Sequence, residues 1–281
     1  MKIALGTVQW GLNYGISNLN GIPSDRELMA ILALAKKNNI TLYDTASQYG
    51  SAEERLGEHL DVDCDVITKL NYVDPNTSIE QELNRSLQKL KKKQIYGYLL
   101  HNSNSLLGSD HLWLQMNKLK EKELVRKIGY SIYYPNELLK LLEKKFIPDI
   151  IQLPYSILDR KFEPYFDYLK SLGIEIHVRS VFLQGLYFLN PKKLPARLSE
   201  LYNVLSYIKK LSESNGVSIS RMCLDFVKQN EKVDFAIIGV ENTSQLNETI
   251  RREKHNLEWT KINKFIENIE INKELLNPTK W

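Results

Sequence analysis

The chain has 281 residues, 43% of them hydrophobic, and a formal net charge of +4. This length and composition are ordinary for a globular protein with a sizeable core, and the slight charge argues against a nucleic-acid partner. No basic and apolar leader follows Met1, and no apolar run approaches the roughly 18 residues of a membrane span. We therefore expect neither a signal peptide nor a membrane anchor.

The cysteines Cys64 and Cys223 lie far apart and without metal-ligand spacing. Both are typical of small buried side chains in a reducing compartment. We expect a cytoplasmic protein that holds no metal ion.

Eight short β-branched or apolar runs are candidate strands, and longer segments of helical periodicity separate them. Strands that are covered on both faces are hydrophobic almost throughout, as these runs are. The runs are Ile3–Gly6, Leu42–Asp44, Val66–Lys69, Tyr96–Leu100, Lys127–Ser131, Ile150–Gln152, Ile174–Arg179 and Phe235–Ile238.

The segments between these runs carry helix signals. Ser24–Glu27 and Ser51–Glu54 match the capping box, and Thr77 with Glu80 predicts a third helix start. Further helices are expected over Leu112–Glu123, Asn136–Lys144, Glu163–Ser171, Ser199–Ser214 and Ser218–Gln229, and two more, Ser244–Glu253 and Trp259–Ile269, follow the last strand.

Eight strand–helix units in about 240 residues are typical of a (β/α)8 barrel, whose usual length is ~250 residues. No linker rich in glycine, serine or proline interrupts the series, so we expect residues 1–281 to form a single α/β domain, a TIM barrel with additional C-terminal helices. A doubly wound open sheet is the alternative. It needs a glycine-rich phosphate turn after the first strand, and Gly6–Gly11 does not match G-x-G-x-x-G.

Four ionisable residues lie at or near the ends of consecutive predicted strands. Asp44 ends the second strand, Lys69 ends the third, His101 directly follows the fourth, and Tyr49 lies five residues beyond Asp44. The carboxyl ends of barrel strands meet at one rim, which holds the active site. A carboxylate, an ammonium, an imidazole and a phenol at that rim are suited to proton transfer.

The expected roles follow from the chemistry of each group. A tyrosine has an ordinary pKa of about 10, which is high for a proton shuttle near neutrality. Lys69 would lower the pKa of Tyr49, Asp44 would keep Lys69 charged, and His101 would hydrogen-bond a bound carbonyl oxygen. Taken singly, each residue has a structural explanation, such as a turn cap or core packing, but their joint placement favours a functional site.

The string from Asp44 to Glu53, read as Asp-Thr-Ala-x-x-Tyr-Gly-Ser-x-Glu, resembles the signature of the aldo-keto reductases. The resemblance spans nearly the whole chain. It continues in order through Thr68–Lys69, Leu99–His101, Gln152 with Tyr155, Arg179–Gly185, and Ile238–Gly239 followed by Gln245–Glu248.

This resemblance implies an NAD(P)H-dependent oxidoreductase on a (β/α)8 barrel. Such an enzyme transfers hydride between the nicotinamide cofactor and the carbonyl of an aldehyde or ketone, or its alcohol. The catalytic residues implied are Asp44, Tyr49, Lys69 and His101, with Tyr49 as the general acid and base.

The resemblance also implies where the cofactor binds. Ser131 and Gln152 would hold the nicotinamide carboxamide, Ser180–Gly185 would wrap the pyrophosphate, and Gly239–Glu248 would embrace the adenosine. Ser244 is the expected N-cap of a helix whose dipole favours a phosphate. The expected cofactor-binding residues are Thr7, Asp44, Ser131, Gln152, Arg179, Ser180, Phe182, Gln184, Gly185, Gly239, Glu241, Gln245 and Glu248.

Three residues depart from the family pattern. Ile132 stands where Asn usually follows the serine that corresponds to Ser131. Arg179 stands where many members have an aromatic ring, and its guanidinium would stack on the nicotinamide or meet an anionic substrate. Glu241 lies where many NADPH-specific members have Lys or Arg, and it would repel a 2′-phosphate unless Arg251 or Arg252 compensates. Family habit favours NADP(H), and NAD(H) is the alternative.

The expected substrate is a small carbonyl compound or alcohol, and the pocket residues lean towards a polar, sugar-like one. The pocket residues expected besides Tyr49 are Trp10, Tyr14, Tyr72 and Asn102. Two other functions stay open. One is a nucleotide-binding regulatory subunit with little turnover, although we expect such a subunit to have a long N-terminal extension. The other is a lyase that uses Lys69 as a Schiff-base amine. We expect a monomer or a weak homo-oligomer.

Overall fold

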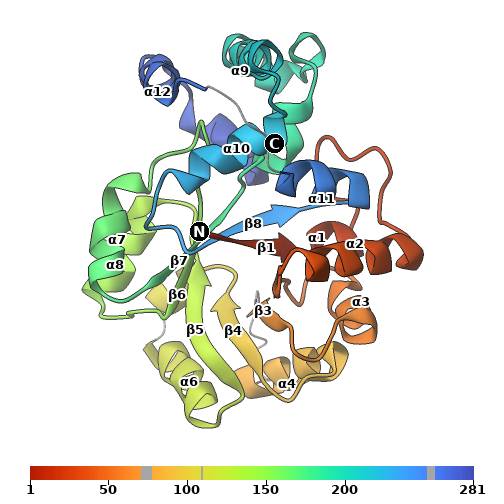
Figure 1. Cartoon of the computed structure of the whole chain (residues 1–281). Helices are drawn as coiled ribbons and strands as arrows, with labels where there is room; N and C mark the ends of the chain where they lie inside the picture. Colours follow the sequence, from red (N-terminus) through yellow and green to blue (C-terminus); the bar gives the residue numbers. More distant parts are fainter. Residues whose placement is uncertain (71–77, 109, 252–256) are drawn as a thin grey trace.

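The computed structural model describes residues 1–70, 78–108, 110–251 and 257–281. Within these residues eight parallel strands close into a barrel in chain order, because β1 pairs with both β2 and β8 (Figure 1). The strands are β1 (Lys2–Gly6), β2 (Leu42–Asp44), β3 (Asp65–Leu70), β4 (Ile95–Leu100), β5 (Val125–Ser131), β6 (Ile150–Pro154), β7 (Glu175–Arg179) and β8 (Phe235–Gly239). The predicted (β/α)8 barrel is confirmed, and the open sheet is wrong.

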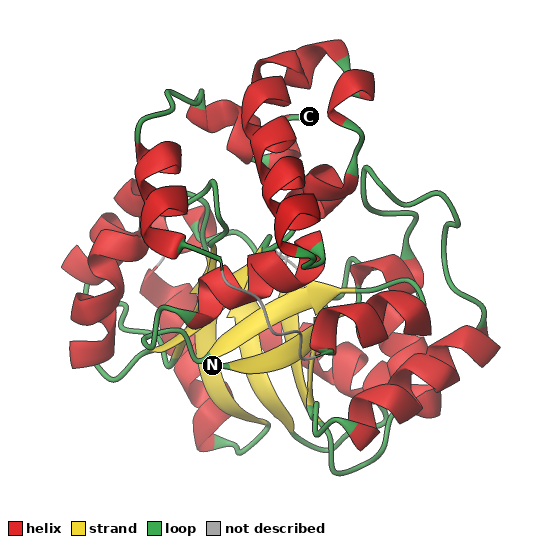
Figure 2. Cartoon of the chain, turned by 45° about the horizontal axis from the view of Figure 1, so that its top comes forward, coloured by secondary structure: helices red, strands yellow, loops and turns green. Residues whose placement is uncertain are grey.

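Helices surround the barrel, and Figure 2 shows them in red around the yellow strands. Among the described residues two α-helices, α11 and α12, follow β8, so the predicted C-terminal helices are confirmed. The α-helices are α1 (Val8–Gly11), α2 (Asp25–Lys37), α3 (Ala52–His59), α4 (Ile79–Leu90), α5 (Asn104–Leu107), α6 (Asp110–Glu121), α7 (Pro135–Glu143), α8 (Phe166–Ser171), α9 (Tyr202–Asn215), α10 (Ile219–Lys228), α11 (Thr243–Ile250) and α12 (Trp259–Glu267). The short 3-10 helices are η1 (Glu163–Tyr165), η2 (Leu183–Phe188), η3 (Pro191–Lys193), η4 (Ala196–Leu201), η5 (Lys273–Leu276) and η6 (Pro278–Lys280).

Two of the predicted helix starts differ from the structure. The side chain of Ser51 makes no capping hydrogen bond at α3, because Glu53 turns inward and accepts a hydrogen bond from Thr68 Oγ1 at 2.6 Å. The capping box of α4 is Ser78 with Gln81, one residue later than predicted. The first predicted helix start is confirmed, since Ser24 accepts a hydrogen bond from the backbone N–H of Glu27. Its capping box is only half formed, because the Glu27 side chain accepts hydrogen bonds from Thr243 instead.

The barrel interior is built in layers. The layer nearer the amino ends of the strands is a separate apolar cluster that consists of Ala4, Leu42, Ile67, Leu99, Ile150 and Ile237. Alternate residues of a strand point to the same side of a sheet, so the residue two positions further on lies in the next layer. That layer therefore contains Asp44, Lys69, His101 and Gln152, each two positions beyond a member of the apolar cluster. Strand periodicity alone brings these polar side chains together at the carboxyl ends of the strands.

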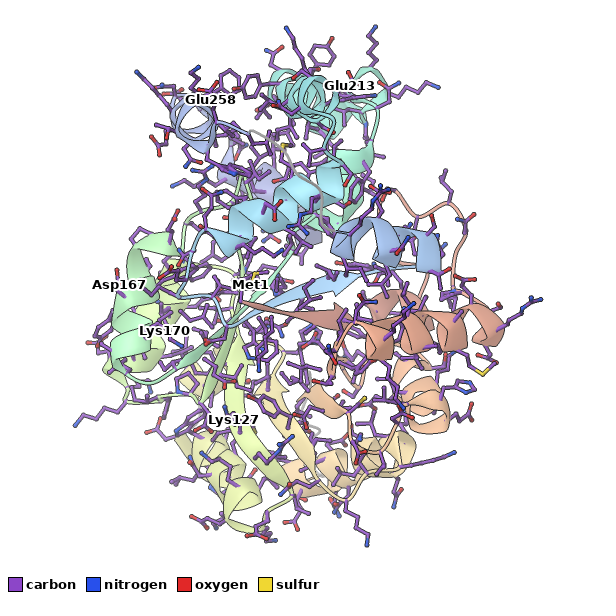
Figure 3. The ribbon with its side chains drawn as sticks, viewed as in Figure 1. Met1, Lys127, Asp167, Lys170, Glu213 and Glu258 are labelled. Atoms are coloured by element: carbon purple, nitrogen blue, oxygen red, sulfur yellow. The ribbon has the colours of Figure 1, made fainter. Side chains whose placement is uncertain are left out.

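A second and larger apolar cluster fills the space between the barrel and its helices. Charged side chains such as Asp167 on α8 and Glu213 on α9 lie on the outer surface (Figure 3). In the part of the chain that the structure describes, no helix is long and apolar enough to cross a membrane.

Candidate active site

The centre of the polar layer is a buried ion pair. Lys69 Nζ lies 2.5 Å from Asp44 Oδ1, and it also donates a hydrogen bond to the carbonyl oxygen of Thr45 at 2.9 Å. Both charged side chains are almost inaccessible, with 1% exposure for Lys69 and 5% for Asp44. Lys69 is therefore closed off from the cleft, which argues against the lyase alternative, because a Schiff-base amine must reach a carbonyl substrate.

Gln152 completes this pair in a way that the sequence analysis did not anticipate. Its Nε2 donates a hydrogen bond to Asp44 Oδ2 at 2.8 Å, so the two carboxylate oxygens of Asp44 have one partner each. The alternation along β6 was the available signal, since Gln152 follows the interior residue Ile150 by two positions. Gln152 therefore orients Asp44 in addition to lining the cleft.

The loop that carries Tyr49 is held against β3 and α1. The backbone N–H and the hydroxyl of Ser47 both donate to the carbonyl oxygen of Lys69, at 3.2 and 3.1 Å. On the other side, a Cβ on Gly11 would lie 1.8 Å from the carbonyl oxygen of Tyr49, and one on Gly50 would lie 2.2 Å from the carbonyl oxygen of Gly11. Two glycines thus allow the backbones to touch and set the position of Tyr49.

Tyr49 lies beside the other predicted catalytic residues. Its ring meets the imidazole of His101 edge to face, with centroids 5.8 Å apart and planes at 84°. Lys69 Nζ lies 5.2 Å from the centroid of the Tyr49 ring. The four residues Asp44, Tyr49, Lys69 and His101 therefore form one group, with Tyr49 and His101 facing the cleft and Lys69 behind them.

The surroundings shift the pKa of three of these side chains. Burial raises the pKa of the Tyr49 phenol well above its ordinary value, and Asp44 adds to this rise while Arg179 opposes it. Burial also lowers the pKa of the Lys69 ammonium against the attraction of Asp44. The pKa of His101 falls to about 3, because the imidazole is buried and Lys69 and Arg179 are positively charged. The expected net lowering of the Tyr49 pKa is not found, since burial and Asp44 outweigh the effect of Arg179.

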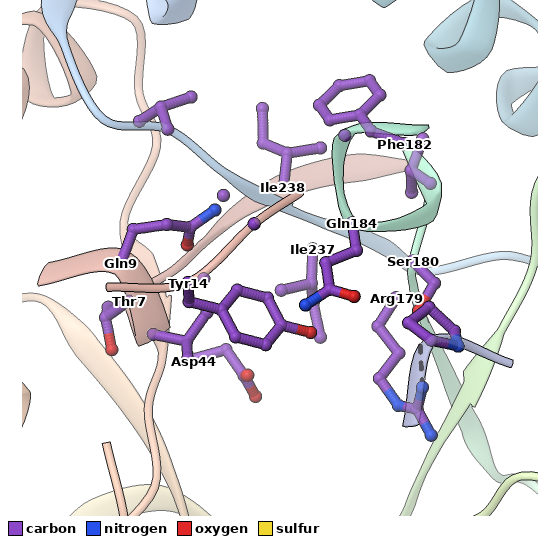
Figure 4. A pocket seen from close by; sticks show the side chains of 18 of the residues that line it. Thr7, Gln9, Tyr14, Asp44, Arg179, Ser180, Phe182, Gln184, Ile237 and Ile238 are labelled. Atoms are coloured by element: carbon purple, nitrogen blue, oxygen red, sulfur yellow. Dashed lines mark hydrogen bonds between the residues drawn. The ribbon is translucent and has the colours of Figure 1, made fainter. Parts of the chain in front are cut away.

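A cleft of about 620 Å³ opens above the group (Figure 4). In Figure 4, Gln9, Tyr14 and Asp44 lie across the cleft from Arg179 and Ser180. The predicted residues that line the cleft are Thr7, Tyr14, Asp44, Tyr49, His101, Gln152, Arg179, Ser180, Phe182, Gln184, Gly185, Gly239, Glu241, Gln245 and Glu248.

Arg179 binds the end of β5. Its guanidinium donates hydrogen bonds to the Oγ of Ser131 at 3.3 Å and to the carbonyl oxygen of Ile132 at 3.0 Å. It also stacks on the Tyr133 ring, with Cζ 4.0 Å from the centroid. Ser131 is buried behind Arg179 and does not itself line the cleft.

The segment after β7 has an unusual backbone. Ser180, Leu183 and Gln184 all have positive φ, at 58°, 43° and 55°, a conformation that costs non-glycine residues about 1–3 kcal/mol each and gathers at functional sites. The backbone N–H of Ile16 donates to the carbonyl oxygen of Gln184 at 3.0 Å, and a Cβ on Gly185 would lie 2.0 Å from Ser17 Oγ. The loop after β1 therefore rests on this segment across the cleft.

The helix at the other end of the cleft begins differently from the prediction. The N-cap of α11 is Asn242, whose Oδ1 accepts a hydrogen bond from the backbone of Gln245 at 2.9 Å. Ser244, the predicted N-cap, lies inside the helix. Glu241 and Gln245 line the cleft here and bind each other through Gln245 Nε2 and Glu241 Oε2 at 3.0 Å.

Two of the predicted substrate-pocket residues do not line the cleft. Trp10 belongs to the core, fully buried, and its indole donates to the carbonyl oxygen of Val240 at 2.9 Å. Asn102 is exposed and accepts a hydrogen bond from the backbone of Asn104. Tyr72 and Arg252 lie outside the described residues.

Several lining residues were missed in the sequence analysis. They come from loops, from the short helices α1, η2 and η6 and from the start of α10, for which strand periodicity gives no signal. They include Gln9, Leu12, Gln48, Tyr133, Phe188, Ser220, Pro278 and Thr279.

Comparisons with known proteins agree with this architecture. The L-glyceraldehyde 3-phosphate reductase of Escherichia coli O157:H7 is 24% identical over 294 residues, which cover 89% of this chain and 84% of that protein. An aldo-keto reductase from Bacillus halodurans has the same fold, with a TM-score of 0.75, 19% identity and coverage of 98% and 95%. An aldo-keto reductase from Klebsiella pneumoniae, solved in complex with NADPH, has a TM-score of 0.68, 17% identity and coverage of 97% and 88%.

The family itself follows from a match over almost the whole chain. The model of the aldo/keto reductase family matches residues 2–269. This range contains the barrel, the buried ion pair and the tyrosine beside it. The chain therefore belongs to the aldo/keto reductase family and is an NAD(P)H-dependent oxidoreductase.

Proposed function

We propose that this protein reduces the carbonyl group of an aldehyde or ketone with Tyr49 as the general acid. In the reverse direction Tyr49 would be the base that accepts the proton of the alcohol. The bound nicotinamide nucleotide supplies or accepts the hydride. The observation that carries the proposal is the group of Tyr49, His101, Lys69 and Asp44 beneath the cleft.

The cleft suits a nicotinamide nucleotide. Two buried oxygen atoms that line it, Thr7 Oγ1 and Gln9 Oε1, have no hydrogen-bond partner among the described residues, and a ligand would provide one. The backbone is left-handed at Ser180 and at residues 183–185, which is a preformed arrangement for close approach of a ligand. We propose that Gln152 holds the nicotinamide and that Ser131, which was expected to hold it too but lies behind Arg179, positions the guanidinium of Arg179 instead. Ser180–Gly185 would bind the pyrophosphate, and Gly239, Glu241, Gln245 and Glu248 would bind the adenosine.

At neutral pH the pKa shifts leave Tyr49 protonated and His101 neutral, although a raised pKa makes the Tyr49 phenol a weaker acid than a free tyrosine. Because burial raises the pKa of Tyr49, the phenol keeps its proton at neutral pH, which is the state a general acid requires. Because the pKa of His101 is about 3, its imidazole is neutral there and would hydrogen-bond the carbonyl oxygen without competing as an acid. Lys69, bound to Asp44, places a positive charge behind Tyr49, where it would stabilise the phenolate after proton transfer.

We propose a polar, sugar-like carbonyl substrate. The residues that support this are the polar side chains Gln48, Tyr133, Arg179 and Thr279, which line the cleft together with Tyr14. The relative from Escherichia coli is named for reduction of a phosphorylated sugar aldehyde. Activity on apolar aldehydes without activity on sugar aldehydes would contradict this choice.

The decisive experiment is Tyr49→Phe, with Tyr202→Phe as the matched control on the exposed surface of α9. Tyr49→Phe is expected to abolish carbonyl reduction and to leave nucleotide binding close to that of the wild type. Turnover by this variant at the wild-type rate would refute the role of Tyr49. Nucleotide binding without turnover in the wild type, across a panel of carbonyl compounds, would instead favour the regulatory subunit.

A further inference from the structure

Residues at the N-terminus of α11 line the same cleft as Arg179. Barrel enzymes often bind phosphate with the loops after the seventh and eighth strands and with a following helix N-terminus. Here that helix N-terminus already holds a carboxylate. Glu27 of α2 accepts hydrogen bonds from the backbone N–H and the hydroxyl of Thr243, at 2.6 and 3.0 Å.

A second N–H group of this helix end is also occupied, because the backbone of Gln245 donates to Asn242 Oδ1. Two protein side chains therefore fill the hydrogen-bonding positions that a phosphate would use. The negative charge of Glu27 lies where the dipole of α11 would otherwise attract an anion.

Glu27 does not itself line the cleft, but two other carboxylates near the N-terminus of α11, those of Glu241 and Glu248, do. Glu241 is oriented by Gln245 through two contacts, since the Glu241 N–H donates to Gln245 Oε1 at 2.8 Å and Gln245 Nε2 donates to Glu241 Oε2 at 3.0 Å. Glu248 accepts a hydrogen bond from the hydroxyl of Ser220 at 3.0 Å. These contacts present oriented hydrogen-bond acceptors at the place proposed for the adenosine.

The nearby cations among the described residues do not offset these charges. Arg221 pairs with Asp225 at 2.7 Å and donates to the carbonyl oxygen of Arg251 at 3.2 Å. Arg251 is exposed, and neither arginine is among the described residues that line the cleft.

We propose that this protein binds NAD(H) in preference to NADP(H), and that Glu27 and Glu241 determine the preference. Glu241 would accept a hydrogen bond from a ribose hydroxyl, which NAD(H) has and which the 2′-phosphate of NADP(H) replaces. That phosphate carries up to two negative charges and would meet the carboxylates of Glu241 and Glu27. The preference depends on the proposed nucleotide site and departs from the family habit.

The test is titration of tryptophan fluorescence with NADH and NADPH side by side. Trp10 is a suitable reporter, because its indole binds the carbonyl oxygen of Val240, a residue that lines the cleft. The variants are Glu241→Gln and Glu27→Gln, which keep a hydrogen-bond acceptor and remove the charge. Glu213→Gln, on the exposed surface of α9, is the control.

The wild type is expected to bind NADH at least about tenfold more tightly than NADPH. The reason is repulsion between the 2′-phosphate and the carboxylates, at about 5 Å in a partly solvated site. Each of the two variants is expected to tighten NADPH binding about tenfold, more at low salt than at high salt, while Glu213→Gln changes neither constant. Equal or tighter binding of NADPH by the wild type would overturn the preference. An unchanged ratio in both variants would overturn the role of the two carboxylates. Binding of neither nucleotide would refute the proposed function itself.

Discussion

Gly11 allows a sharp test of how the fold positions Tyr49. A Cβ at this position would lie 1.8 Å from the Tyr49 carbonyl oxygen and 2.6 Å from the backbone nitrogen of Ala52. Because real Cβ contacts are essentially never shorter than 3.0 Å, Gly11→Ala must separate the two backbone segments by about 1.2 Å. The displaced segment carries the phenol that would donate the proton.

The expected effect on turnover follows from that displacement. A misplacement of about 1 Å at a reacting group lowers the rate about 100-fold, so kcat of Gly11→Ala should fall by about that factor. Overpacking is also expected to destabilise the protein by about 1–3 kcal/mol, which corresponds to a fall in Tm of about 2–10 °C. Nucleotide binding is expected to stay within about threefold, because Gly11 is not among the described residues that line the cleft.

The assay follows nicotinamide absorbance with a carbonyl compound that the wild type reduces, together with nucleotide titration and thermal unfolding. Gly108→Ala is the matched control, since no heavy atom lies within 4 Å of its added Cβ. A folded Gly11→Ala variant with wild-type kcat would refute the reasoning, and so would an equal loss in Gly108→Ala.

Four further predictions concern ionisable side chains. Lys69→Met leaves the buried carboxylate of Asp44 without its cation. The variant should therefore lose turnover, and its free energy of unfolding, measured by urea titration, should fall by about 3–5 kcal/mol. Combining Lys69→Met with Asp44→Asn should recover part of that stability. Since the pKa of His101 is about 3, kcat should be flat from about pH 5 to 8; a step near pH 6.5 that His101→Asn removes would contradict this. Because the pKa of His101 is lower in the folded protein than in the unfolded chain, the unfolded chain binds a proton at a higher pH than the folded protein does. The contribution of His101 to the free energy of unfolding should therefore fall as the pH drops from 6.5 towards 3. Burial raises the pKa of Glu175, but hydrogen bonds from His177, Lys127 and Tyr96 lower it more, to about 2. The wild type should therefore lose stability as the pH falls from 4.5 to 2, and Glu175→Gln should lose less over the same range.

The proposed catalytic group could be placed from the sequence because the order of its residues depends on local periodicity. Asp44 and Lys69 end apolar runs, and strand alternation sends both side chains to the same side of the sheet. Closure of the barrel then makes them neighbours. Strand alternation along β6 also places Gln152 beside them, because Gln152 follows the interior residue Ile150 by two positions.

The electrostatic expectations were less reliable, because a pKa depends on everything around a group. The charge of Lys69 was expected to lower the pKa of Tyr49, but burial and Asp44 raise it. Arg179 was expected to face the nicotinamide or the substrate, yet it also binds Ser131 and Ile132 on the neighbouring β5. Neither effect follows from sequence spacing.

The sequence by itself determined the eight strands, their enclosing helices, and the identity of the polar residues at the strand ends, since these depend on hydrophobic period and order along the chain. The tertiary structure decided the contacts between distant segments. Glu27 meets Thr243 across 216 positions, and Gln152 meets Asp44 across 108, because barrel closure and helix packing bring these segments together. Glu241 was already visible in the sequence as a residue that disfavours NADP(H), but the position of Glu27 at the N-terminus of α11 depends on packing between distant segments, and no local pattern in the chain encodes it.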